Sequence, residues 1–185
     1  MPILKRIIRL GLIFVLLTGR SLLCAQTAPV AVEYQLKAVF LFNFTKFVEW
    51  PADAFNSDQE PFVIGVLGGN PFGSYLEDVG AGEKVNGHPL VIKYFKTLDE
   101  VKSCHILFVN KAGITNLGDL LSAIKGKSIL TVSDASDFLR SGGMVRFYIN
   151  SNNKVQLQMN QDAAKIARLQ ISSKLLRLTD KYEPK

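Results

Sequence analysis

One short segment constrains the fold more than any other feature of this chain: residues 105–109 (HILFV) resemble a strand but do not alternate apolar and polar residues. A strand with one wet face alternates apolar and polar residues, whereas an apolar run of this kind is typical of a parallel sheet covered on both faces. Residues 61–67 (PFVIGVL) form a second run, and segments with helical spacing alternate with the strands up to about residue 140. We therefore predict a three-layer α/β fold, with a mostly parallel sheet and helices on both faces.

A hairpin and several further elements complete this prediction. Residues 144–149 and 154–159 flank Asn150-Ser151-Asn152-Asn153, and these turn-forming side chains predict a C-terminal antiparallel hairpin. Asn70 is a good N-cap and Pro71 a good first residue for a helix over residues 71–79, which a glycine-rich loop follows. The other expected strands are residues 90–95 and 128–132, and the other expected helices are 33–50, 97–101, 115–124, 135–139, 161–169 and 172–179.

The predicted helix over residues 33–50 is apolar around most of its surface, and Pro51 ends it. The residues that recur at helical spacing are Leu36, Phe40, Phe44 and Phe47. Further apolar residues widen this face, as in a helix that is buried on several sides. A core helix explains the pattern, and so does a helix that also contacts another subunit or a partner. The candidates for that contact are Leu41, Phe42 and Val48.

Basic residues recur in the two terminal helical segments. The candidates for contact among them are Arg168, Lys174 and Arg177. Their spacing is typical of a solvated face, and it would also suit an acidic partner surface or anionic lipid headgroups.

The first 25 residues predict export. Lys5, Arg6 and Arg9 are followed by a short apolar stretch and then by small and polar residues up to Ala25, which is the order of a secretory signal peptide. The apolar stretch is shorter than the roughly 20 residues that span a bilayer. An uncleaved signal anchor and a lipoprotein modified at Cys24 are the alternatives. We expect cleavage near Ala25, a linker over residues 26–32, one domain over 33–180 and a tail over 181–185.

The charge of the exported chain is close to neutral. The leader contains four of the 22 Lys and Arg residues and no acidic residue, which leaves 18 basic against 16 acidic residues. A nucleic-acid partner is therefore not expected, because binding to phosphates needs a strongly basic surface. Cleavage also removes Cys24, so Cys104 is the one thiol of the mature chain and no internal disulfide is expected.

Small and polar residues follow three of the predicted strands. In a parallel sheet, ligands bind beyond the carboxyl ends of the strands. The residues at these ends are Gly69, Asn70, Lys111, Ser133 and Asp134. They predict a pocket for a small anionic ligand at helix N-termini, although turns and caps alone would also need such residues. Neither common nucleotide-binding glycine pattern is present.

Reactive groups are sparse in the sequence. Cys104 and His105 are neighbours on one strand, so their side chains point to opposite faces and do not hold one metal ion. A serine or cysteine hydrolase would use Ser133 or Cys104 with His88 or His105 as the base, but neither histidine lies in a recognisable motif. We predict no catalytic residue, no metal site and no cofactor, and keep the hydrolase as an alternative.

Several segments together resemble the YfiR family (DUF4154 domain). The resemblance begins at residues 33–51 (EYQLKAVF, then NFTKFVEWP) and continues through residues 62–66 and 71–73. It includes the strand over residues 104–109, the segment from 129 to 147 and the terminal residues 170–176 (QISSKLL). These pieces occur in order over almost the whole mature chain.

The resemblance implies an α/β periplasmic regulator and not an enzyme. Family members of the best-known type bind the periplasmic sensor domain of an inner-membrane diguanylate cyclase, hold it inactive and keep cyclic-di-GMP low; release favours biofilm formation. A homodimer is common among them. Well-known members contain several cysteines whose disulfides couple repression to redox state, whereas this mature chain keeps only Cys104. The sequence thus predicts a repressor that acts by contact, with a small-ligand binding module as the alternative.

Overall fold

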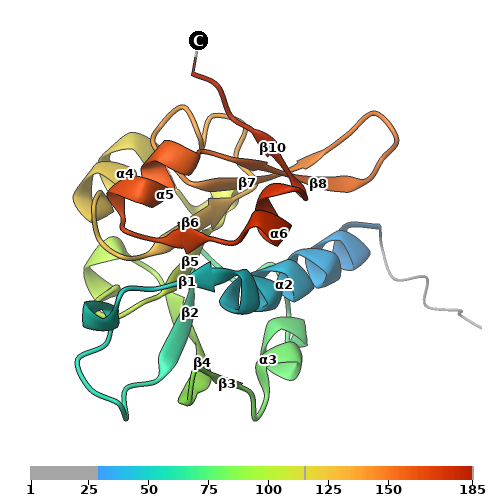
Figure 1. Ribbon diagram of the computed structural model, residues 1–185. Helices are drawn as coiled ribbons and strands as arrows, with labels where there is room; N and C mark the ends of the chain where they lie inside the picture. The colour runs from blue at the N-terminus through green and yellow to red at the C-terminus, as the bar shows by residue number, and fades with distance from the viewer. Residues whose placement is uncertain (1–28, 115, 185) are drawn as a thin grey trace, which may run out of the picture.

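The computed structural model describes residues 29–114 and 116–184, so the predicted signal peptide and residues 26–28 of the predicted linker lie outside the described residues. Figure 1 shows a twisted central sheet with helices packed against it. The eight strands of this sheet lie in the order β10-β8-β7-β6-β5-β2-β4-β3. Their bounds are β2 Phe62–Leu67, β3 Lys84–Val85, β4 His88–Phe95, β5 Ile106–Val109, β6 Leu130–Ser133, β7 Val145–Ile149, β8 Val155–Met159 and β10 Thr179–Lys181.

The sheet is mostly parallel, as predicted. The five strands β4, β2, β5, β6 and β7 are parallel to one another in this order, and β10 pairs in parallel with β8. The predicted hairpin is confirmed as the antiparallel pair β7–β8, and β3 pairs antiparallel with the start of β4. Two short strands outside this sheet, β1 (Val48–Glu49) and β9 (Gln170–Ile171), pair antiparallel with each other.

Helices cover both faces of the sheet. Their bounds are α2 Pro29–Phe47, α3 Tyr75–Gly80, α4 Leu117–Ile124, α5 Gln161–Ile166 and α6 Ser173–Leu176. One core cluster joins α2, α3, α5 and α6 to the first face, and a second joins α4 to the other face. Apolar and polar residues do not alternate in β2 because both of its faces are buried. Phe62, Ile64 and Val66 belong to the first cluster, while Val63 and Leu67 belong to the second. The three-layer prediction is therefore confirmed.

The long helix α2 begins four residues earlier and ends three residues earlier than predicted. It ends at Phe47 because Val48 and Glu49 pair with β9. Its buried stripe is also offset from the predicted one: Leu36 is 43% exposed, whereas Ala38, Leu41 and Phe44 are buried. Within residues 29–114 and 116–184, no helix has both the length and the apolar character that crossing a membrane requires.

The segment after β2 forms a turn where a helix was predicted. The Asn70 side chain accepts a hydrogen bond from the Phe72 amide at 2.8 Å and donates one to the Gly73 carbonyl at 2.7 Å. Asn70 thus closes a local turn, Gly73 has a left-handed φ of 62°, and α3 starts only at Tyr75. Asn70 is therefore not the N-cap of α3, and that prediction was wrong.

The last 50 residues differ most from the prediction. Residues 135–139 form turns and not a helix, and α5 ends at Ile166, shortly before Arg168 with its left-handed φ of 59°. Residues 179–181 form β10 on the free edge of β8, so Lys181 belongs to a strand and not to a tail. The unpaired edge of β8 is the physical reason, because it offers backbone partners to a segment with weak helical preference.

Candidate functional site

A buried lysine on α2 forms the centre of the candidate site. The Lys37 side chain is 2% exposed and lies beside the core residue Ala38. Its Nζ atom is 2.6 Å from Glu33 Oε1, one helical turn away, and 2.6 Å from Asp134 Oδ2. A buried ammonium group is tolerated only when it is paired, so these two carboxylates explain why a lysine occupies the core face of this helix.

Asp134 joins this helix to the sheet. It directly follows β6, at the carboxyl end of the strand, and its side chain is 8% exposed. The Tyr34 hydroxyl donates a 2.9 Å hydrogen bond to Asp134 Oδ2, the same oxygen that Lys37 contacts. Burial, and then this hydrogen bond to a carboxylate, raise the pKa of Tyr34. Asp134 Oδ1 is also buried but has no hydrogen-bond partner.

A cavity of about 210 Å³ opens beside Asp134. Lys37, Lys111, Asp134, Arg146 and Tyr148 are among the residues that line it. Arg146 donates from Nη1 to the Ser136 carbonyl at 2.8 Å, and its guanidinium carbon is 5.4 Å from the centre of the Tyr148 ring. Its Nε atom is buried without a hydrogen-bond partner. The residues that line the cavity thus include Lys111, which is exposed, and two residues with a shielded polar atom that has no partner, Asp134 and Arg146.

The structure brings only some of the predicted ligand residues together. Lys111 and Asp134 line the cavity described above, which we call the β6 notch, whereas Gly69, Asn70 and Ser133 do not. The Ser133 hydroxyl is fully buried, donates to the Val109 carbonyl at 2.6 Å and accepts from the Ala135 amide at 3.2 Å. Ser133 thus fixes the backbone after β5 and β6 and has no free polar group for a ligand.

Close backbone packing fills the space between the ends of β2 and β5. A Cβ atom on Gly113 would lie 2.2 Å from the Gly68 carbonyl oxygen, so the two glycine segments touch. The Asn110 side chain also donates to the Gly69 carbonyl at 3.3 Å. Gly69 therefore packs against the loop after β5 and not around a shared anion pocket.

The predicted contact residues have two different environments. Leu41 and Val48 are buried in the core, so neither is available to a partner, and the core-helix interpretation of this face holds for them. Phe42 is half-buried beneath Lys46, whose Nζ is 4.5 Å from the ring centre.

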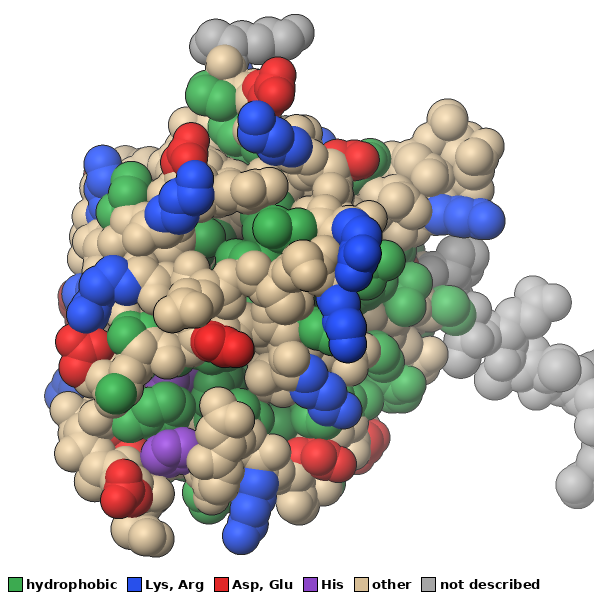
Figure 2. All heavy atoms as spheres, viewed as in Figure 1, with side chains coloured by type: hydrophobic (Ala, Val, Ile, Leu, Met, Phe, Trp, Pro, Cys, Tyr) green, Lys and Arg blue, Asp and Glu red, His purple; other side chains and the backbone are tan. Residues whose placement is uncertain are grey.

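The predicted basic contact residues lie on the surface. Arg168, Lys174 and Arg177 are exposed, and Arg168 is paired with Asp53 at 2.8 Å. Figure 2 shows Lys and Arg side chains in a row over α6 and α2 on the viewed face.

Two groups of the hydrolase alternative, Cys104 and His105, lie on opposite faces of the sheet. The Cys104 thiol belongs to the core cluster that includes α4, donates to the Ile106 carbonyl at 2.9 Å and has a pKa raised to about 12 by burial. His105 lies on the other face, stacked on Phe62 with ring centres 4.6 Å apart, and burial lowers its pKa. A thiol with so high a pKa, on the far side of the strand from its neighbouring histidine, is a poor nucleophile.

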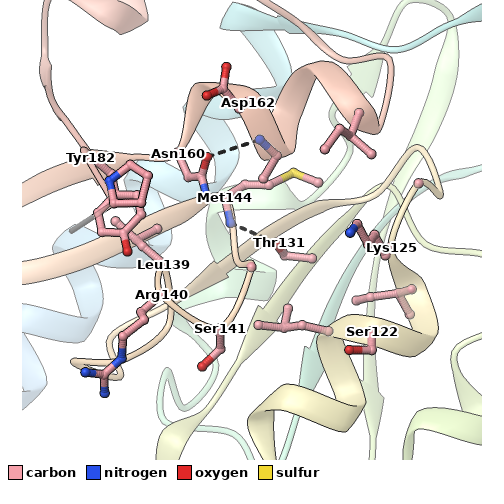
Figure 3. A pocket seen from close by; sticks show the side chains of 17 residues that line it. Ser122, Lys125, Thr131, Leu139, Arg140, Ser141, Met144, Asn160, Asp162 and Tyr182 are labelled. Carbon is pink, nitrogen blue, oxygen red and sulfur yellow. Dashed lines mark hydrogen bonds between the residues drawn. The ribbon is translucent and has the colours of Figure 1, made fainter.

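A second cavity, of about 350 Å³, lies between α4 and α5 (Figure 3). The Asn160 side chain accepts from the Ala163 amide at 3.1 Å, and the Thr131 hydroxyl accepts from the Met144 amide at 3.1 Å, as the dashed lines mark. Lys125, the residue directly after α4, lies on the opposite wall. Of the buried unpartnered polar atoms in residues 29–114 and 116–184, none belongs to this cavity. This cavity is larger than the β6 notch.

Sequence reasoning missed the main residues of the candidate site. Lys37, Tyr34 and Arg146 were not singled out, and Glu33 was treated only as the start of a helix. The available signal was Lys37 itself, a lysine in a helix that is apolar around most of its surface, four residues after a glutamate.

An α/β sheet with a polar notch at the carboxyl ends of its strands has the architecture of a binding domain. The family model described as YfiR/HmsC-like (DUF4154) matches residues 34–180, and the chain belongs to this family. The family is regulatory and non-catalytic, is related to cyclic-di-GMP signalling and is periplasmic. No curated protein matches the chain.

Proposed function

We propose that this protein is a periplasmic repressor that contacts an inner-membrane diguanylate cyclase, or a related membrane sensor, and so lowers cyclic-di-GMP. The family match over residues 34–180 is the observation that carries the proposal. We also propose that the signal peptide over residues 1–25 directs export and that the protein acts as a homodimer.

The exposed basic row over α6 and α2 supports contact as the mode of action. Lys174, Arg177 and Lys46 are exposed, and none of them forms an ion pair with another described residue. Unpaired surface charges of one sign guide association with a surface of opposite charge and penalise the wrong partner. The proposed partner surface is therefore acidic.

Charge reversal tests this proposal in the bacterium that encodes the protein. We expect deletion to raise cyclic-di-GMP, the wild-type gene to restore the low level, and the Lys174→Glu/Arg177→Glu variant to fail. The matched control is Lys96→Glu/Lys102→Glu, which makes the same charge change at two exposed lysines around the short helix Leu98–Glu100.

Cross-linking identifies the partner in the same strains. A photoreactive residue at position 174 should capture an inner-membrane protein with a cyclase or sensor domain. Unchanged cyclic-di-GMP on deletion would refute the proposed repression, whereas equal complementation by both double variants would refute the basic row as the contact surface.

A further inference from the structure

The cavity between α4 and α5, which we call the α4–α5 cavity, lies at the amino-terminal ends of β6 and β7, whereas the β6 notch lies at the carboxyl end of β6. Thr131 is the second residue of β6, Met144 directly precedes β7, and both line the cavity. Because α4 packs on one face of the sheet and α5 on the other, the cavity forms where the two helical layers meet this end of the sheet. Its volume of about 350 Å³ lies within the range of roughly 300–1,000 Å³ that is typical of sites for small molecules.

Apolar side chains from three segments line this cavity. Leu121 and Ile124 come from α4, Leu139 and Met144 come from the segment between β6 and β7, and all four are buried. Ile166, at the end of α5, also lines the cavity, but it is 53% exposed. A bound molecule with an apolar body would cover Ile166 and remove this apolar surface from water, which is favourable.

The charge that the cavity leaves uncommitted is positive. Lys125 and Arg140 line it, are exposed, and form no ion pair with another described residue. Asp162 is the one acidic side chain among the described residues that line the cavity, and it is paired with Lys165 at 3.3 Å. In Figure 3 the Lys125 amino group is directed toward Met144, whereas the Asp162 carboxylate is directed away from it. The charged group that a ligand meets at this wall is therefore an ammonium.

We propose that the α4–α5 cavity binds a small carboxylate with an apolar body. The apolar body lies against Ile166 and the buried wall that α4 provides, and the carboxylate accepts a hydrogen bond from the Lys125 ammonium. A neutral molecule of the same shape lacks the ion pair, and a shorter carboxylate lacks the apolar contact. This binding does not depend on the proposed contact with a membrane protein.

Three probes separate the contribution of the apolar body from that of the charge. Hexanoate has both, hexanol keeps the body without the charge, and acetate keeps the charge with a single methyl group. Because each methylene group buried in an apolar pocket raises the affinity severalfold, acetate should bind at least tenfold more weakly than hexanoate. An ion pair with an exposed lysine contributes less, so hexanol should bind about two- to fivefold more weakly than hexanoate.

A methionine methyl group reports binding inside the cavity by nuclear magnetic resonance. The chain contains three methionines, of which Met144 lines the cavity, whereas Met159 is fully buried and does not line it. In protein labelled with ¹³C at the methionine methyl groups, the Met144 signal is assigned by its loss in Met144→Leu. This signal should shift and saturate on titration with hexanoate, and the Met159 signal should move much less.

Substitutions at the surface of the cavity test where the ligand lies. Lys125→Gln should weaken the binding of hexanoate and leave that of hexanol unchanged. The matched control is Lys127→Gln, which removes another exposed lysine after α4 that does not line the cavity, and it should change neither. Ile166→Asn should weaken both probes, because both use the same apolar contact.

Three results would overturn the proposal. The first is a Met144 signal that hexanoate does not move at about 20 mM, well above a millimolar dissociation constant. The second is equal binding of hexanoate and hexanol to the wild type, which would show that Lys125 takes no part. The third is an equal loss of hexanoate affinity in Lys125→Gln and Lys127→Gln, which would show that only the general surface charge acts. All three leave the cyclic-di-GMP measurements untouched.

Discussion

Replacing Lys37 with methionine tests whether the buried ion pair holds α2 on the sheet. Methionine keeps much of the length and flexibility of the lysine stem, so the main loss is the ammonium group. Asp134 would then keep only the Tyr34 hydroxyl as a donor while remaining largely buried. Removing one partner of a buried pair costs about 3–5 kcal/mol, because the other charge stays without compensation. That loss is a large part of the roughly 5–15 kcal/mol that stabilises a typical domain.

Urea unfolding measures this loss directly. Trp50 is the single tryptophan, and its indole donates to the His105 carbonyl at 3.1 Å, so its fluorescence reports the packing of the core. We expect a lower midpoint with an unchanged dependence of the unfolding free energy on urea. The control is Lys165→Met, which breaks a pair with Asp162 whose side chains are 74% and 84% exposed.

The exposed pair should contribute less than about 1 kcal/mol. A second comparison is the double variant Lys37→Met/Asp134→Leu, which should regain much of the stability because no unpaired charge remains in the core. If Lys37→Met were no more destabilising than Lys165→Met, the claim that this buried pair fixes α2 would be refuted.

Three further predictions concern the rest of the core. Burial lowers the pKa of His105, so the folded protein binds its proton less readily than the unfolded chain does. The unfolding free energy should therefore fall as pH drops below about 6.5, by at most about 1.4 kcal/mol per pH unit. Urea unfolding from pH 8 to pH 5 should show a smaller fall in the His105→Phe variant than in the wild type. Gly143→Ala places a Cβ 2.3 Å from Phe138 ring atoms and should cost about 1–3 kcal/mol in thermal or urea unfolding, partly regained in the double variant with Phe138→Leu. Cys104, with a pKa of about 12, should react with a thiol reagent at pH 8 only as fast as the protein opens, and immediate labelling would contradict its burial.

The central sheet was predictable because its strands are buried on both faces. A run such as FVIGVL in β2 needs no partner information to be recognised, and the Asn-rich turn defines the β7–β8 hairpin. The short pairs β1–β9 and β10–β8 were not predictable. The strands β1, β9 and β10 have only two or three residues each, too few to show a periodic pattern. Their strand conformation comes from the backbone segment with which each pairs.

The candidate site was only partly predictable, because its residues come from opposite ends of the chain. The rule that ligands bind beyond the carboxyl ends of strands led to Lys111 and Asp134. It also led to Gly69 and Ser133, since sequence does not show that Ser133 turns inward to the Val109 carbonyl or that Gly68 touches Gly113. Lys37 was missed because its partner Asp134 is 97 residues away.

The same separation has a kinetic consequence. Contacts between distant parts of a chain form late, after the loop between them has closed. α2 is the first described element of the chain, yet the group that fixes it, Asp134, becomes available only once β6 is in place. Interactions absent from the folding transition state mainly slow unfolding. The Lys37–Asp134 pair should therefore slow unfolding and lengthen the lifetime of the native state, with little influence on the folding rate.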